Sequence, residues 1–125
     1  MAGPSSARKY HHGDLRRAAV QRAGELVAAQ GIDAIALRSI ARYLGVTHAA
    51  LAHHFGERRA ILQEMAREGF DALADAMDEA ALRTGSEAER LRAVGEAYVA
   101  VARRLPGHFR VMFGRELLAE CVAPP

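Results

Sequence analysis

The sequence predicts an all-α fold, in which a three-helix head is followed by an incomplete helical domain. Half of the 125 residues are hydrophobic, yet they do not form the β-rich runs that are typical of strands. Apolar residues recur instead at three- and four-residue spacing, and glycine or proline separates the periodic segments. We expect three parts: a flexible N-terminal arm (1–12), a helix-turn-helix domain (13–56) and a partial helical sensor domain (57–125).

The first helix is expected to begin near Asp14, a suitable N-cap residue, and to run to about Gln30. Its expected buried stripe consists of Leu15, Ala19, Ala23, Leu26 and Val27. Gly31 ends the helix, and Ile32 is placed for the apolar contact that accompanies such an end.

A helix-turn-helix is predicted over residues 37–55. Its two helices are expected at about Arg38–Leu44 and His48–His54. Gly45 stands where the turn needs a left-handed residue, and Thr47 is the expected N-cap of the second helix. Leu51 and Phe55, four residues apart, would point back into the core. The second helix of such a motif is the one that enters a DNA major groove.

Three further helices are predicted. The fourth is expected from about Glu57 to Arg83, and the fifth begins at the capping box formed by Ser86 and Glu89. The fifth helix ends at Pro106-Gly107, and Val122–Pro125 ends the sixth. The expected inner face of the fifth helix is Leu91, Val94, Gly95, Tyr98, Ala102 and Leu105, and that of the sixth is Phe109, Met112, Phe113, Leu117 and Leu118.

Charge is distributed unevenly along the chain. Residues 1–59 contain nine Arg and Lys against four Asp and Glu, whereas residues 60–125 contain eight against eleven. Long-range attraction would therefore steer a polyanion to the half with the helix-turn-helix. The alternative is an arginine-rich solvated surface without a partner.

Several other classes of protein are disfavoured. No apolar run reaches the roughly 20 residues of a membrane span, and the N-terminus lacks a signal region, so a cytoplasmic location is expected. The single Cys121 is interpreted as an ordinary apolar residue rather than a redox sensor. The six histidines lack the spacing of a metal site, and no catalytic motif is present, so we expect no metal, no cofactor and no enzymatic activity.

The helix-turn-helix region and the segment Tyr10–Arg17 resemble the TetR family of bacterial transcriptional regulators. The residues that carry the resemblance are Leu37, Arg38, Ile40, Ala41, Gly45, Val46, Thr47, Leu51, His54, Phe55, Arg58 and Ile61. Ala52 departs from the family, which has Tyr there, and Arg58 replaces the usual Lys. The missing Tyr removes a phosphate contact, so affinity for DNA would be lower.

The resemblance implies double-stranded DNA as the partner, with a palindromic operator. Thr47, His48, Ala49, Ala50 and His53 are expected to face the groove, where histidines hydrogen-bond base edges and alanines contact thymine methyls. Arg38 matches a DNA-contacting position, and His54 and Arg58 are expected to bind phosphates. The alternative is that the alanines permit packing and Arg38 is merely solvated. The arm either reaches the DNA or has no role.

Family members are longer, about 190 to 200 residues, and their last helices form a homodimer interface while helices 4–8 enclose an effector. We therefore interpret the chain as truncated or assembled differently, with an apolar patch from Phe109 to Leu118 that favours self-association. Phe70, Tyr98, Phe109, Met112 and Phe113 are the candidate effector pocket, the alternative being plain core.

The expected function is sequence-specific DNA binding, as a ligand-responsive repressor. The alternative is a helical protein-interaction module that pairs with a full-length relative and does not bind operators itself.

Overall fold

The computed structural model describes residues 12–117. Within them the chain is all-helical, as predicted, with no strand. The helices are α1 (His12–Gln30), the 3₁₀ helix η1 (Ile32–Ala34), α2 (Leu37–Leu44), α3 (His48–His54), α4 (Arg58–Ala81), α5 (Glu87–Arg104) and α6 (Pro106–Met112). The arm at residues 1–11, Leu118, Cys121 and Val122–Pro125 lie outside this range.

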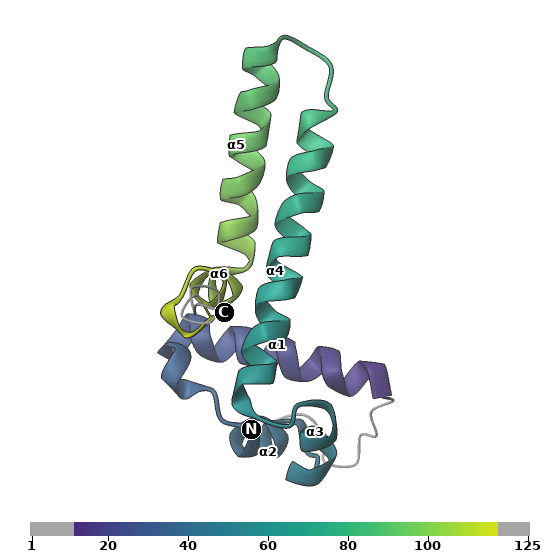
Figure 1. Ribbon diagram of the computed structural model, residues 1–125, viewed down its shortest axis with the longest axis vertical. Coiled ribbons are helices and arrows are strands. Elements are labelled where there is room, and N and C mark those ends of the chain that lie inside the picture. Colours follow the sequence, from purple (N-terminus) through teal and green to yellow (C-terminus); the bar gives the residue numbers. More distant parts are fainter. Residues whose placement is uncertain (1–11, 118–125) are drawn as a thin grey trace, which may run out of the picture.

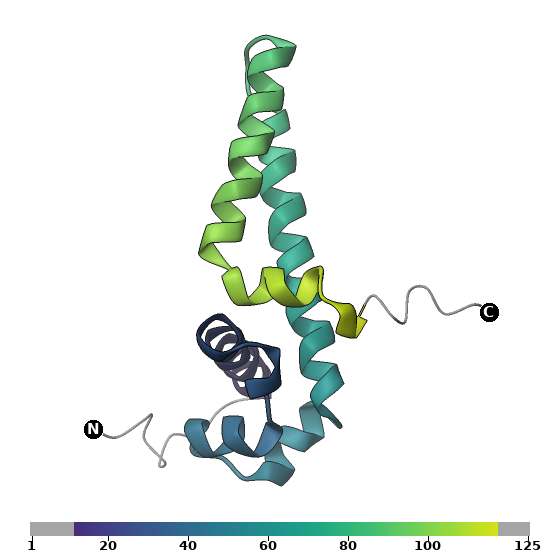
Figure 2. The ribbon, with the colours of Figure 1, turned by 90° about the vertical axis from the view of Figure 1, so that its left-hand side faces the viewer.

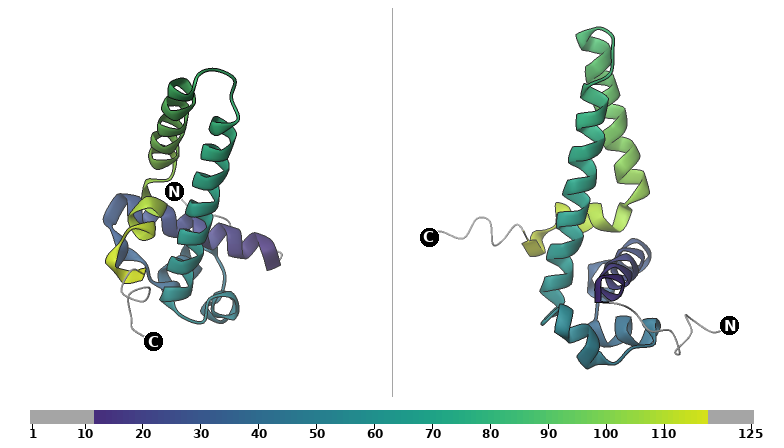
Figure 3. Two further views of the ribbon diagram at one scale, coloured as in Figure 1. Left: turned by 45° about the horizontal axis from the view of Figure 1, so that its top comes forward. Right: turned by 90° about the vertical axis from the view of Figure 1, so that its right-hand side faces the viewer.

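Helices α4 and α5 form a long antiparallel hairpin that rises from a compact base (Figure 1). Helix α1 crosses the base of the hairpin, and α2 and α3 lie beneath it. The view along α1 shows this helix between α6 on one side and α2 with α3 on the other (Figure 2). Two further views show that α6 packs beside both α1 and α4 (Figure 3). Helix α1 therefore joins the helix-turn-helix to the rest of the molecule.

The core of the head draws one apolar stripe from each helix. The largest fully buried side chains include Val20 and Val27 of α1, Ile40 of α2, and Leu51 with Phe55 at α3. Helix α4 completes this core with Ile61, Leu62 and Met65, which are also fully buried. Burying a side chain of this size stabilises the fold by roughly 1.5–3 kcal/mol, so α4 is part of the head as much as of the hairpin.

Local sequence signals place the turn between α2 and α3. Gly45 has φ 72° and ψ 28°, the left-handed conformation that glycine adopts without strain, and its N–H donates to the carbonyls of Ala41 and Arg42. The Thr47 hydroxyl accepts a hydrogen bond of 3.1 Å from the Ala50 N–H. Both predictions for this turn are confirmed, and α3 spans His48–His54 as expected.

The capping box of α5 is also confirmed. The Glu89 N–H donates to the Ser86 hydroxyl at 3.2 Å, and the Ser86 N–H donates to the Glu89 carboxylate at 3.3 Å. These two reciprocal bonds satisfy backbone groups that have no partner inside the helix, so the hairpin has a well-defined upper turn.

Two expectations were wrong in detail, and one element was not predicted. Helix α1 begins by His12, so Asp14 lies in its first turn and is not the N-cap. The 3₁₀ helix η1 was not predicted. The inner face of α5 is rotated from the expected one: Val101 is buried, whereas Leu91 is 74% exposed and Tyr98 is 38% exposed. A helix that packs mainly on one neighbour buries only a narrow stripe of side chains. The positions of the apolar residues in α5 did not show which stripe that is.

No helix in the described range is long and apolar enough to cross a membrane.

Candidate nucleic-acid interface

Helix α3 presents a small exposed face. Thr47, His48, Ala49 and His53 are exposed, and Ala50 is half-buried against the core. Four of the five residues predicted to face a groove are therefore accessible to a partner. Ala52, in place of the family's Tyr, is half-buried.

The position of α3 is set by contacts on its opposite side. Leu51 and Phe55 are fully buried. Arg16 of α1 donates from Nη1 to the carbonyl of His54 at 3.3 Å, and its guanidinium carbon lies 4.9 Å from the centre of the Phe55 ring. A cation over an aromatic face adds attraction to the hydrogen bond. Arg16 is therefore a positioning residue for α3.

Sequence reasoning did not identify Arg16, because 38 positions separate it from His54. The same guanidinium donates to the Glu64 carboxylate of α4 at 3.3 Å. Glu64 also pairs with Arg67 one turn further along α4. The hydrogen bond from Arg67 holds the pKa of Glu64 below its usual value, and the charge of Arg16 acts in the same direction against the opposing effect of burial.

Helix α2 adds exposed cations beside α3. Arg38 and Arg42 are both exposed. Arg42 was not among the predicted site residues, although it follows Arg38 by one helical turn, a spacing that places both on one face. Tyr43 is 39% exposed and is covered by the guanidinium of Arg22, whose carbon lies 3.7 Å from the ring centre.

Arg58 bonds to the backbone of the head, and its predicted role as a phosphate ligand stays a prediction. Its Nε donates to the Ile35 carbonyl at 3.0 Å, and one terminal nitrogen donates to the Ile32 carbonyl at 2.7 Å. These bonds attach the first turn of α4 to the segment between α1 and α2. Because the planar guanidinium spans two carbonyls, Arg58 serves to hold the head together.

His54 is half-buried between rings. The centroid of the His54 imidazole ring lies 5.7 Å from the centroid of the His53 ring and 6.4 Å from that of the Phe55 ring. Its phosphate contact stays a prediction. Within the described residues, no group of three or more His, Cys, Asp or Glu side chains is placed to hold a metal ion.

Four of the five residues predicted to line an effector pocket form an aromatic row, and their role in binding an effector stays a prediction. The centroid distances are 5.6 Å from Phe70 to Phe113, 5.7 Å from Phe113 to Phe109 and 5.5 Å from Phe109 to Tyr98. Phe70 is 45% exposed and Phe113 is 50% exposed. Met112, the fifth residue, is buried and packs against Gly69 of α4. A cavity of about 470 Å³ lies elsewhere, between α1 and the start of α6, and none of these five residues lines it.

Comparisons with known proteins agree with this geometry. Residues 19–65 match the family described as bacterial regulatory proteins, tetR family. A protein of unknown function from Rhodococcus sp. RHA1 has a similar structure, with a TM-score of 0.73 and 36% identity over 94% of this chain and 58% of that one. A TetR family transcriptional regulator, PfmR from Thermus thermophilus, has a TM-score of 0.67 and 30% identity over 75% of this chain and 51% of that one.

The chain thus spans little more than half the length of these two solved structures. No protein of curated function matches its sequence. The family match covers the later part of α1, η1, both helices of the turn motif and the first part of α4, which are the elements that position the α3 surface. Residues 19–65 therefore form a helix-turn-helix domain similar to that of the TetR family of bacterial regulatory proteins.

Proposed function

We propose that this protein regulates transcription by binding double-stranded DNA in a sequence-specific manner, with α3 in the major groove. The observation that carries the proposal is the match of residues 19–65 to a family of regulatory proteins. It is supported by an exposed α3 face on a helix whose other side is fully buried. A fixed helix is what base reading requires, because hydrogen bonds to base edges depend on position.

The base-reading residues are Thr47, His48, Ala49 and His53. Their hydroxyl and imidazole groups hydrogen-bond base edges, and the Ala49 methyl contacts thymine. Phosphates beside the groove are bound by Arg38 and Arg42 of α2. Both guanidinium groups are exposed. Such contacts fix the register of the protein on the duplex but carry little sequence information.

We further propose a ligand-responsive repressor that acts as a homodimer on a palindromic operator, in the cytoplasm and without enzymatic activity. Two heads of this kind bind half-sites about 34–36 Å apart, so the operator symmetry mirrors that of the protein. The Thermus relative is a transcriptional regulator, which supports the regulatory part of the proposal. The alternative, a module that pairs with a longer relative and binds no operator, predicts no specific DNA complex.

Selection of bound duplexes from a random DNA pool tests the proposal. We expect a palindromic consensus, and a binding constant that falls steeply with salt because phosphate binding releases counterions. Recovery of unrelated sequences, with equal affinity for all of them, would reject sequence-specific binding and favour the protein-interaction module.

Arginine variants then test whether α2 faces the DNA. Replacing Arg38 with alanine should lower the slope of log affinity against log salt by about 1. Arg83, in the turn between α4 and α5 at the far end of the molecule from α3, is the matched control and should leave the slope unchanged (Figure 1). Equal effects of the two variants would mean that α2 does not face the DNA.

Histidine variants test base reading. Replacing His48 or His53 with alanine should relax the preference at one or two base positions, at about 1–3 kcal/mol per lost contact. A selected consensus that both variants share with the original protein would exclude these two side chains as readers.

A further inference from the structure

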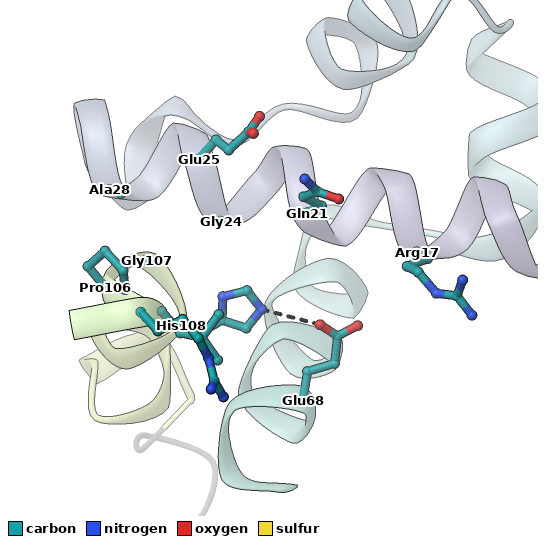
Figure 4. Close-up of a pocket in the computed structure, with 11 residues that line it drawn as sticks. Arg17, Gln21, Gly24, Glu25, Ala28, Glu68, Pro106, Gly107 and His108 are labelled. Atoms are coloured by element: carbon teal, nitrogen blue, oxygen red, sulfur yellow. Dashed lines mark hydrogen bonds and ion pairs between the residues drawn. The ribbon is translucent and has the colours of Figure 1, made fainter. Parts of the chain in front are cut away.

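We propose that the cavity between α1 and α6 binds a small organic acid with an apolar body and one carboxylate. The cavity has a volume of about 470 Å³, within the range of roughly 300–1,000 Å³ that is typical of small-molecule sites. Its apolar surface comes from Ala28 of α1 and from Leu105 and Pro106 at the start of α6. Figure 4 shows α1 on one side, with Pro106, Gly107 and His108 facing it.

Two cationic side chains that line this cavity have no ion pair or hydrogen bond to another described residue. Two carboxylates line it, but both have partners: Glu25 pairs with Arg22 at 3.4 Å, and Glu68 pairs with His108 at 3.3 Å. Arg17 and Arg104 also line it, and neither guanidinium has an ion pair or hydrogen bond to another described residue. Guanidinium groups bind carboxylates in a fork geometry, so Arg17 and Arg104 are the groups that would bind the carboxylate of a ligand.

His108 forms the inner wall. It is the buried polar residue of the described core, 7% exposed, and its ring reaches from α6 to Glu68 of α4 (Figure 4). The ring also packs against the backbone of Gly24 in α1. Three helices thus converge on one side chain, which gives the cavity a defined shape before any ligand enters.

The same cavity lies where the head meets the remainder of the molecule. The backbones of α1 and α6 touch, because a Cβ atom at Gly107 would overlap the carbonyl of Gly24. Helix α1 also carries Arg16, which bonds to the last residue of α3. A ligand wedged between α1 and α6 therefore changes the position of α1 and, with it, the position of α3. This coupling rests on the proposed function, whereas the binding of the acid does not.

The binding test uses benzoate and octanoate as probes and benzamide and octanamide as neutral controls of the same size. Binding is followed by NMR shifts of the backbone amides, without DNA. We expect the acids to shift the backbone N–H signals of residues 24–28, 104, 105, 107 and 108. Benzamide, octanamide and inorganic phosphate should leave these signals unchanged. Arg17→Gln and Arg104→Gln should each weaken binding of the acids about fivefold, as expected for loss of a charge-assisted bond at an accessible site.

Arg103→Gln is the matched control, because this neighbour of Arg104 is exposed and does not line the cavity. The proposal is overturned if neither acid shifts these backbone N–H signals at 20 mM, or if benzamide, octanamide or phosphate binds as well as the acids. It is also overturned if the double variant R17Q/R104Q binds the acids as tightly as the original protein.

The coupling is tested on a duplex recovered by selection. A saturating acid should change affinity for that duplex in the original protein and leave the R17Q/R104Q variant unaffected. Binding of the acid without an effect on DNA affinity would retain the ligand site and reject the coupling. Absence of any selected duplex would reject the proposed function while the NMR result still decides the site.

Discussion

Arg16 and Arg58 each direct a guanidinium at backbone carbonyls from another element. Arg16 reaches the end of α3, and Arg58 reaches the carbonyls of Ile32 and Ile35 before α2. All three carbonyls lie at or near a helix end, where the helix itself supplies few donors to the last carbonyls. The two guanidinium groups therefore supply donors that the local backbone provides only in part, since the Ile32 carbonyl also accepts from the Ile35 N–H.

Arg58→Ala should lower the free energy of unfolding by about 1–3 kcal/mol, because it removes the side-chain donor to the Ile35 carbonyl and one of the two donors to the Ile32 carbonyl. Arg38→Ala is the control, since Arg38 is exposed on the neighbouring helix. It should change stability by less than about 0.5 kcal/mol. Urea unfolding followed by circular dichroism measures both, and equal stability of the two variants would contradict the structural role of Arg58.

The Thr47 cap is open to a similar measurement. Thr47→Ala removes the acceptor of the Ala50 N–H and should cost about 1 kcal/mol of unfolding free energy. Thr47→Ser keeps the hydroxyl and should restore most of that loss. If serine and alanine destabilise the protein equally, the methyl group of Thr47 matters and the cap does not.

The Glu64 ion pairs predict a pH dependence. Because Arg67 and Arg16 lower the pKa of Glu64 in the folded protein, its contribution to stability is fully present above the ordinary pKa of 4.5 that the unfolded chain has. The contribution is lost as the pH falls through the lower folded pKa. The difference in unfolding free energy between the original protein and Glu64→Gln should therefore shrink between pH 6 and pH 3.

Glu79→Gln is the control for this series, since Glu79 is an exposed residue of the same helix without an ion pair to a described residue. It should show no such change with pH. A constant difference between Glu64→Gln and the original protein across this range would rule out a stabilising role for the charge of Glu64.

At the scale of elements, α6 depends on a close approach to α1. Gly107→Ala places a methyl group against the Gly24 carbonyl, which is backbone and cannot rotate away. We expect a destabilisation of about 1–3 kcal/mol, as found for overpacked sites, and a lower melting temperature in calorimetry.

Gly95→Ala is the matched substitution in the interior of α5. A Cβ there meets no atom within 4 Å, and the residue is exposed. Alanine should stabilise the helix by about 0.5–1 kcal/mol. A Gly107→Ala protein as stable as the original one would mean that α1 and α6 separate easily, without the tight contact described above.

At the scale of the whole molecule, the aromatic row across α4, α5 and α6 is an apolar surface left open to solvent. Contiguous exposed apolar patches mark interaction sites, so we expect this 125-residue chain to self-associate in sedimentation experiments at micromolar concentration. The double substitution of Phe70 and Phe113 with Gln should shift the distribution toward monomer.

Leu82→Gln also replaces an exposed apolar side chain with glutamine, but at the tip of the hairpin. This variant should leave the self-association unaffected. A chain that stays monomeric at 100 µM would exclude this surface as a contact between copies. Association that persists unchanged in the Phe70 and Phe113 variant would place the contact on another face.

Short-range physics made the helices and their ends predictable from the sequence. Gly45, Thr47 and the pair Ser86 and Glu89 act on backbone groups within a few residues, so each can be identified from the residue types alone. The buried stripe of α1 and the exposed face of α3 follow from helical spacing in the same way. The all-helical class, the family resemblance and the α3 surface were therefore available before the structure.

Tertiary packing decided the rest, because the deciding contacts join residues that are distant in the chain. Arg110 donates to the Val27 carbonyl across 83 positions, and Arg58 reaches Ile32 across 26. The position of α6 decides two further features. They are the cavity beside Gly24 and the aromatic row formed by Phe70, Phe113, Phe109 and Tyr98. Apolar spacing shows that a helix has an inner face but does not say which neighbour covers it. That choice depends on the packing of complete helices, and it placed the aromatic residues on the surface and the cavity against α1.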